Sequence, residues 1–196
     1  MRKGLRRIRS HELAILVCFG ATGIALCGVL DLNQKNQEKT QWCWAASCQS
    51  VLEFYGLAVT QTSIASYGAG GSNVWNYLWG SGNPGDGIFR RGCNLILTNF
   101  GGVSSYGFTG LLTLPQLQAE VDGARPVVIN WAWDGGGGHI LVARGVVSNN
   151  VYLMDPWYGA SVNDYAWVCQ GGGIHGSGHS RYPRPARQPM ASRVGG

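Results

Sequence analysis

The chain has 196 residues, of which 45% are hydrophobic, 31 are glycine and 8 are tryptophan. This hydrophobic fraction excludes a wholly disordered protein and predicts one folded domain with additional segments. The formal net charge of +5 is concentrated at the ends, with net +4 in residues 1–27, net +4 in residues 181–196 and net −3 between them, which excludes a basic nucleic-acid-binding domain.

Residues 1–30 have the pattern of a secretory signal. A basic stretch, MRKGLRRIRSHE, precedes the apolar run LAILVCFGATGIALCGVL, as in the n-region and h-region of a signal peptide. The run is short and rich in glycine and alanine, so we expect cleavage and secretion or periplasmic release, with only transient membrane contact. An uncleaved anchor and lipidation of Cys27 remain alternatives, although Leu26 stands where a lipoprotein signal needs a small residue.

Residues 43–55 are predicted to form an amphipathic helix after a polar, extended lead-in over 28–40. Apolar side chains recur along it at i, i+3, i+4 and i+7, namely Cys48, Val51, Leu52 and Tyr55. This spacing places them on one face of a helix, and the following glycine is a favourable stop.

Further helices are predicted between this helix and the strand-rich part of the chain. Three are short and separated by glycine-rich turns, at 61–67, 73–79 and 93–100. A better-defined helix begins at Thr113, has a proline in its first turn, and ends at Gly123.

The second half of the domain is rich in strand-forming residues. Strands are predicted at 127–133, 139–147 and 151–155, and a further short one at 165–169. The turn Ser148-Asn149-Asn150 joins two of them as a hairpin. Helices followed by antiparallel strands make the fold class α+β. The domain is placed at 31–170, because residues 171–196 lack apolar periodicity and are predicted to form a flexible tail.

Cys43 is the candidate nucleophile. It stands at the start of the predicted helix 43–55, where unsatisfied N–H groups and the positive end of the helix dipole stabilise a thiolate. Taken alone, an exported cysteine is more often part of a disulfide. If Cys43 is a free thiol, Cys48, Cys93 and Cys169 remain for one bridge, and we favour Cys48–Cys93 although spacing does not decide the pair.

A base and an orienting acid complete the candidate site. Of the four histidines, only His139 belongs to the predicted domain; His11 lies in the leader, and His175 and His179 lie in the tail. Asp155 ends the strand after that of His139, so a hairpin brings the two side by side. Each also has a plain structural explanation, as a buried histidine and as a turn-forming aspartate before proline.

The motifs around these residues resemble the papain-like cysteine peptidases. The matching strings are Gln-x5-Cys-Trp-Ala-Ala beginning at Gln37, Gly-Gly-His-Ile-Leu-Val-Ala over 137–143 and Val-Tyr-Leu-Met-Asp-Pro-Trp-Tyr-Gly over 151–159. The resemblance covers about residues 34–160. It is closest to the compact bacterial branch that includes the staphopains and the secreted effector peptidases of plant pathogens.

The resemblance implies a papain-like fold, in which an N-terminal helical lobe packs its cysteine helix on a C-terminal antiparallel sheet. It implies that Cys43 is the nucleophile, His139 the general base and acid, and Asp155 the orienting acid. Gln37 would stabilise the oxyanion with the Cys43 backbone N–H. Gln41 is a rival for that role, and papain itself has asparagine where this chain has Asp155.

We therefore expect a monomeric cysteine endopeptidase that hydrolyses proteins or peptides through a thioester acyl-enzyme. The cysteine and histidines near the C-terminus lack a fourth ligand, so no metal or cofactor is expected. The same triad could instead cut cell-wall peptides, process a leader peptide after Gly-Gly, or deamidate a protein. A catalytically inactive papain-like binding module is the alternative from a different class.

Three residues near the triad are predicted to contact substrate: Trp44, Trp157 and Gly138. The tryptophans offer a hydrophobic wall for substrate side chains, with core packing as the alternative for each. The glycine allows close approach of a backbone. Trp157 is also predicted to cover the His139–Asp155 pair and to exclude water.

Overall fold

The structure is a computed structural model that describes residues 28–132, 138–170 and 190–195. Three predictions therefore lie outside the described residues. These are the leader up to residue 27, the end of the strand predicted for 127–133, and the tail over 171–189, which contains His175 and His179.

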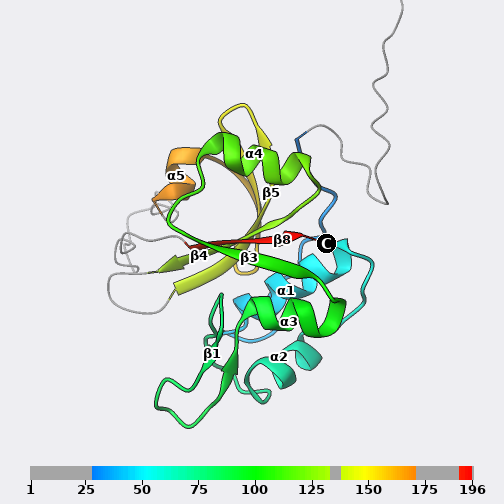
Figure 1. Ribbon diagram of the computed structural model, residues 1–196, viewed down its shortest axis with the longest axis vertical. Helices are drawn as coiled ribbons and strands as arrows, with labels where there is room; N and C mark the ends of the chain where they lie inside the picture. Colours follow the sequence, from blue (N-terminus) through cyan, green and yellow to red (C-terminus); the bar gives the residue numbers. More distant parts are fainter. Residues whose placement is uncertain (1–27, 133–137, 171–189, 196) are drawn as a thin grey trace, which may run out of the picture.

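One antiparallel sheet is enclosed between two groups of helices (Figure 1). The elements in chain order are α1 (Cys43–Phe54), α2 (Gln61–Ala69), β1 (Ser81–Gly82), β2 (Arg90–Arg91), α3 (Cys93–Gly101), β3 (Ser104–Thr109), α4 (Leu114–Asp122), β4 (Val127–Ala132), β5 (Gly138–Val147), β6 (Asn150–Asp155), β7 (Gly159–Asp164), α5 (Tyr165–Cys169) and β8 (Met190–Gly195). The sheet has the order β3-β8-β4-β5-β6-β7, and β1 and β2 form a separate pair. The predicted α+β class is confirmed.

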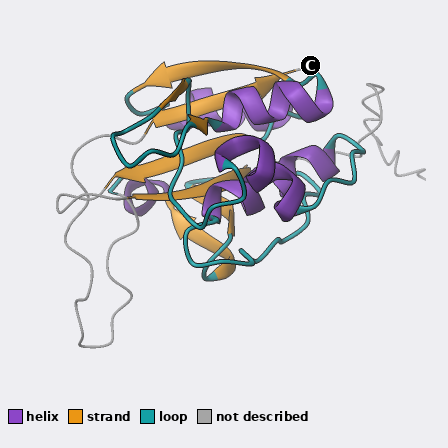
Figure 2. Cartoon of the chain, turned by 90° about the horizontal axis from the view of Figure 1, so that it is seen from below, coloured by secondary structure: helices purple, strands orange, loops and turns teal. Residues whose placement is uncertain are grey.

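Alternating side chains along the central strands divide the interior into two cores. Val128 and Val142 pack with the helices α1, α2 and α3, whereas their neighbours Val127 and Leu141 pack with α4 and α5. Successive side chains on a strand point to opposite faces, so one strand serves both cores. The view from below places helices in front of the strands (Figure 2). The sheet thereby supports α1, whose first residue is Cys43.

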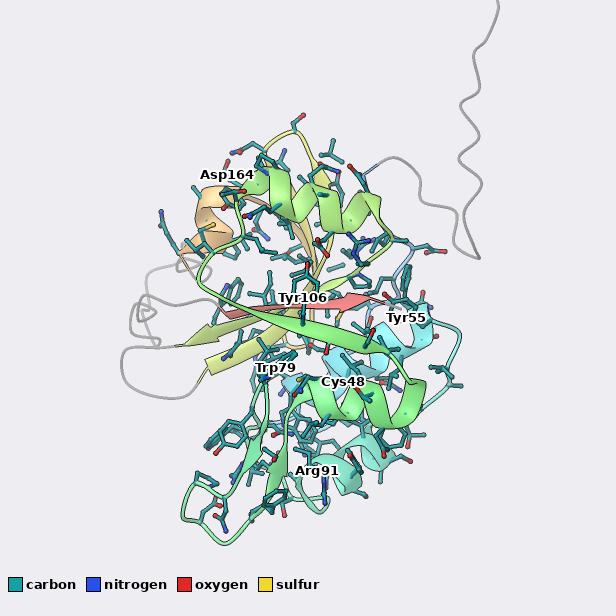
Figure 3. All side chains as sticks on the ribbon, in the orientation of Figure 1. Cys48, Tyr55, Trp79, Arg91, Tyr106 and Asp164 are labelled. Atoms are coloured by element: carbon teal, nitrogen blue, oxygen red, sulfur yellow. The ribbon has the colours of Figure 1, made fainter. Side chains whose placement is uncertain are left out.

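Most predicted helices are confirmed, but the one expected at 73–79 is wrong. The indole N–H of Trp44 donates to the Val74 carbonyl, and the guanidinium of buried Arg90 donates to the Trp75 carbonyl. These tertiary partners occupy carbonyl groups that a helix would need for its own hydrogen bonds. Trp79, at the end of this segment, instead packs over Gly107 of β3 (Figure 3).

The strand predicted at 165–169 is also wrong, because these residues form the short helix α5. Asp164 accepts a hydrogen bond from the Ala166 N–H at 2.8 Å and so caps the helix. The strand lies just before it, at Gly159–Asp164, where it pairs with β6 along its whole length.

The expectation of a flexible tail differs from the structure at residues 190–195. This segment is the strand β8, which pairs with Ser104–Thr109 of β3 and with Val127–Asn130 of β4. Its place is fixed by backbone pairing to strands far away in the sequence. Its short sequence, MASRVG, has no alternation that would reveal such pairing.

The lead-in over 28–40 is extended as predicted, but its first residues belong to the folded domain. Val146 donates its N–H to the Gly28 carbonyl, and Leu30 donates to the Arg144 carbonyl. Leu30 is only 2% exposed. Residues 28–30, which the sequence pattern assigned to the leader, thus pack against β5. Within the described ranges, every helix is too short or too polar to cross a membrane.

Candidate active site

Cys43 is the first residue of α1, and two tryptophans fix this end of the helix. The indole N–H groups of Trp42 and Trp44 donate to the carbonyls of Ser72 and Val74, each at 2.9 Å. Among the described residues, no side chain caps this helix start. The positive end of the helix dipole is therefore free to act on the Cys43 sulfur.

His139 and Asp155 meet because β5 and β6 form the predicted hairpin. His139 Nε2 and Asp155 Oδ1 are 2.8 Å apart, and both side chains are buried. The register shifts by one residue between Ala143 and Gly145, as in a β-bulge. If the register of Val142 and Met154 is continued by one residue, Asp155 lies opposite Leu141. Leu141 and His139 are two residues apart on β5, so Asp155 and His139 lie on the same face of the sheet.

One oxygen of Asp155 accepts three hydrogen bonds. Besides His139, the backbone N–H groups of Trp157 and Tyr158 donate to Oδ1, at 2.8 and 3.1 Å. Although burial alone raises the pKa of Asp155, the hydrogen bond and charge of His139 and these two N–H groups lower it below its ordinary value. Asp155 is therefore an ionised carboxylate at neutral pH, held in place by its own turn.

The imidazole of His139 lies between Asp155 and Cys43. Nε2 bonds Asp155, which leaves Nδ1 as the nitrogen that can interact with Cys43. Burial lowers the pKa of His139, but hydrogen bonds and charges of Asp155 and Cys43 outweigh it and raise the pKa to about 9. The ring is therefore an imidazolium at neutral pH, which is the partner that a thiolate needs.

The other described cysteines lack this environment. Cys48, Cys93 and Cys169 are free thiols, so the disulfide expected between Cys48 and Cys93 is absent from the described part of the chain. These two side chains nevertheless interact in the core between α1 and α3, and Figure 3 labels Cys48 there. Burial raises the pKa of Cys48 well above its ordinary value, and burial also raises the pKa of Cys169. Both are therefore weak nucleophiles.

Gln37 lies beside the turn that follows Asp155, because its backbone N–H donates to the Pro156 carbonyl at 2.9 Å. Its side-chain Nε2 donates to the Lys39 carbonyl, also at 2.9 Å. An amide nitrogen has two hydrogens, so one remains for an oxyanion. The rival Gln41 is exposed, and its backbone N–H bonds to Asn73.

The three predicted substrate contacts have different positions. Trp44 is fully buried and packs in the core below α1, so the expectation that its ring contacts substrate is wrong in this structure. Trp157 is 48% exposed next to Asp155, where a substrate can reach it. Gly138 begins β5, and a Cβ there would collide with the Trp131 carbonyl oxygen, so backbone packing explains this glycine.

Two contacts at the site have no counterpart in the sequence analysis. The backbone N–H of Ile140 donates to Cys43 Sγ at 3.4 Å. The side chain of Gln34 donates to the Asp155 carbonyl at 2.7 Å. No local sequence pattern predicts either contact, because they join residues that are 97 and 121 positions apart in the chain. The first of these contacts and the neighbouring His139 place the Cys43 thiol between an imidazolium and a backbone donor, an arrangement suited to acyl transfer.

Comparisons with known proteins agree with this fold. The model of the Peptidase_C39 like family matches residues 29–171. A double glycine motif protease from an AMS/PCAT transporter, solved in complex with the leader peptide, is 17% identical, with a TM-score of 0.51 over 86% of this chain and 95% of that one. A protein described as a C39-like peptidase from Bacillus anthracis is 16% identical, with a TM-score of 0.51 over 84% and 96%. No curated protein sequence matches the chain.

Proposed function

Because the chain belongs to the Peptidase_C39 like family of cysteine peptidases, we propose that it is an exported endopeptidase with a Cys43–His139–Asp155 triad. The observation that carries the proposal is the bonding of His139. Its Nε2 lies 2.8 Å from Asp155 Oδ1, while its other nitrogen is left for Cys43. In this proposal Cys43 is the nucleophile, His139 the base and Asp155 the orienting acid, the order that thiol catalysis requires.

In the acylation step, Cys43 Sγ attacks the carbonyl carbon of the scissile peptide bond. Gln37 and the Cys43 backbone N–H stabilise the oxyanion that forms. His139 gives its proton to the leaving amine as the C–N bond breaks, and a thioester remains. His139 then takes a proton from water, whose oxygen attacks the thioester. The acid product leaves, and the thiolate–imidazolium pair forms again. Asp155 keeps the ring in place throughout.

Cys43→Ala is the direct test of this mechanism. We expect the full-length wild type to hydrolyse a mixed peptide library, and a thiol alkylator to abolish the hydrolysis. The Cys43→Ala variant should be inactive because the attacking atom is gone. Cys169→Ala removes another partly exposed thiol and should keep full activity. Hydrolysis that survives in Cys43→Ala would exclude Cys43 as the nucleophile.

A second candidate is narrower, namely cleavage of a leader peptide after a Gly-Gly pair. It is favoured by the fold similarity to a double glycine motif protease solved with its leader peptide. Synthetic peptides that differ only in Gly-Gly or Ala-Ala before the scissile bond distinguish the candidates. A narrow leader peptidase would cut only the Gly-Gly peptide, whereas a general endopeptidase would cut both.

Export rests on the basic and apolar pattern of residues 1–30. The intact mass of the protein recovered outside the producing cells tests it. Cleavage of the leader would remove the basic stretch and its apolar run from the recovered chain. A full-length chain that stays with the cells would contradict release by cleavage.

A further inference from the structure

The backbone of Ile140 connects the strand of the base with the helix of the nucleophile. Along one edge of the strand β5, Ile140 pairs with Asn130 of β4. Along the other edge of β5, the last residues paired between β5 and β6 are Val142 and Met154. Pro156 lacks an N–H and follows directly after β6, which prevents the ladder from continuing. Ile140 therefore lies beyond the end of β6, where α1 takes its place.

Two side chains of α1 bond the two backbone groups of Ile140. Its N–H donates to Cys43 Sγ at 3.4 Å. Its carbonyl accepts the hydroxyl of Ser47 at 3.0 Å. Cys43 and Ser47 are four residues apart, so they lie one above the other on the same helix face. One turn of α1 thus bonds both the N–H and the carbonyl of Ile140.

The bond from Ser47 is shielded from water. Ser47 is 0% exposed and Ile140 is 3% exposed. A hydrogen bond in such surroundings is stronger than at the surface, and a buried carbonyl that loses its donor finds no water to replace it. The mechanism above does not use Ser47, so its hydroxyl calls for a separate explanation.

We propose that Ser47 is a positioning residue that, through Ile140, directs a backbone N–H at the Cys43 sulfur. This inference rests on the proposed function, since it concerns the same nucleophile. With Ser47 in place, the thiolate has two donors, the His139 imidazolium and the Ile140 N–H. The bond from Ser47 holds the peptide unit that joins Ile140 to Leu141, and the N–H on the other side of the same residue belongs to the unit that joins His139 to Ile140.

The titratable groups around Cys43 determine how the proposal is tested. Among the described residues, His139 faces it from β5, with Asp155 of β6 behind the ring, and Cys48 is a neighbouring thiol on α1. Substitution of Ser47 changes none of these groups. A change in the pH dependence of Cys43 reactivity would therefore come from the geometry of the N–H donor and not from a lost charge.

Ser47→Ala in the full chain is the test, with Ser50→Ala as the matched control. Ser50 is on the same helix, is 0% exposed and donates to the Asn33 carbonyl at 2.5 Å, away from β5. The readout is the rate of iodoacetamide alkylation at Cys43 between pH 4 and 10, located by mass spectrometry. We expect the midpoint in Ser47→Ala to move upward by about one pH unit, because a donor to the thiolate is weakened.

The steady-state parameters should follow the same pattern. At pH 6, kcat of Ser47→Ala should fall about ten-fold with KM little changed, since the thiolate fraction falls and substrate contacts remain. Ser50→Ala should lose thermal stability without a shift in the midpoint. A folded Ser47→Ala whose midpoint equals that of the wild type would overturn the proposal.

A measurement on the wild type covers the case in which Ser47→Ala does not fold. The NMR amide signal of Ile140 should follow the titration of Cys43, and Cys43→Ala should abolish this response. An amide signal that stays constant would also overturn the proposal. Alkylation and NMR need no substrate, so a wild type without peptidase activity would refute the proposed function while the role of Ser47 was still measured.

Discussion

The Asp155 carboxylate bonds both its own turn and His139, the proposed base. Its Oδ1 accepts the N–H groups of Trp157 and Tyr158 as well as His139 Nε2. A turn-forming aspartate before proline and an orienting acid were alternative interpretations of the sequence, and the geometry accommodates both. The turn makes the carboxylate rigid, so the base is oriented without additional side chains.

Asp155→Asn should move the basic limit of activity to lower pH. His139 must carry a proton to protonate the leaving amine, so kcat/KM falls as the pH rises through the His139 pKa of about 9. The asparagine oxygen can still accept the turn N–H groups, but the negative charge that raises this pKa is gone. The pH–rate profile between pH 6 and 10 measures the shift. Asp164→Asn, at the start of α5, should leave the profile unchanged; an unmoved limit in Asp155→Asn would contradict the role of the carboxylate.

Gln37→Ala should lower kcat by about 10²–10³-fold, the typical loss for one oxyanion donor. KM should change little, because the oxyanion exists only in the transition state. Gln41→Ala is the control and should retain nearly full activity, since Gln41 is exposed and near Asn73. Steady-state kinetics on one peptide distinguish the two glutamines, and a larger loss in Gln41→Ala would transfer the role to Gln41.

At the scale of elements, the bulge in β5 determines on which face of the sheet Asp155 lies. The one-residue shift between Ala143 and Gly145 sets Asp155 on the face of His139 instead of the opposite face. The turn residues and the strand pattern predicted the hairpin. They could not predict the bulge, which lies where the distant residues 28–30 bond to the backbone of Arg144 and Val146.

Gly68→Ala should destabilise the packing of α2 on the helix of the nucleophile. A Cβ at Gly68 would lie 2.6 Å from the Trp44 ring and 3.0 Å from Ile96 of α3. Overpacking of this kind costs about 1–3 kcal/mol of unfolding free energy. Denaturant unfolding of the full-length variant measures it. Ser66→Ala, at an exposed position of α2, should be nearly neutral. Equal stability of Gly68→Ala and the wild type would contradict the close packing.

At the scale of the whole molecule, local sequence patterns predict the elements that depend on near neighbours in the chain. They do not predict the pairings between segments far apart in the sequence. The helix of Cys43, the hairpin of His139 and Asp155, and the α+β order follow from periodicity, turns and caps within about 15 residues. The strand β8 and the extended segment at 73–79 depend on partners far away in sequence, on β4 and on α1. The disulfide expected from export is absent, although the two cysteines are in contact. Trp44 has the sequence position of a substrate contact, but the contacts among α1, α2 and α3 bury it.

The central claim is that, of the four cysteines in the described part of the chain, Cys43 is the reactive one. The most direct measurement is labelling of the full-length protein with a peptide vinyl sulfone at neutral pH, followed by mass-spectrometric mapping. We expect one equivalent of probe on Cys43, with Cys48, Cys93 and Cys169 unlabelled, and a loss of peptide hydrolysis in step with labelling. Probe on another cysteine, or hydrolysis that persists when Cys43 is fully labelled, would contradict the claim.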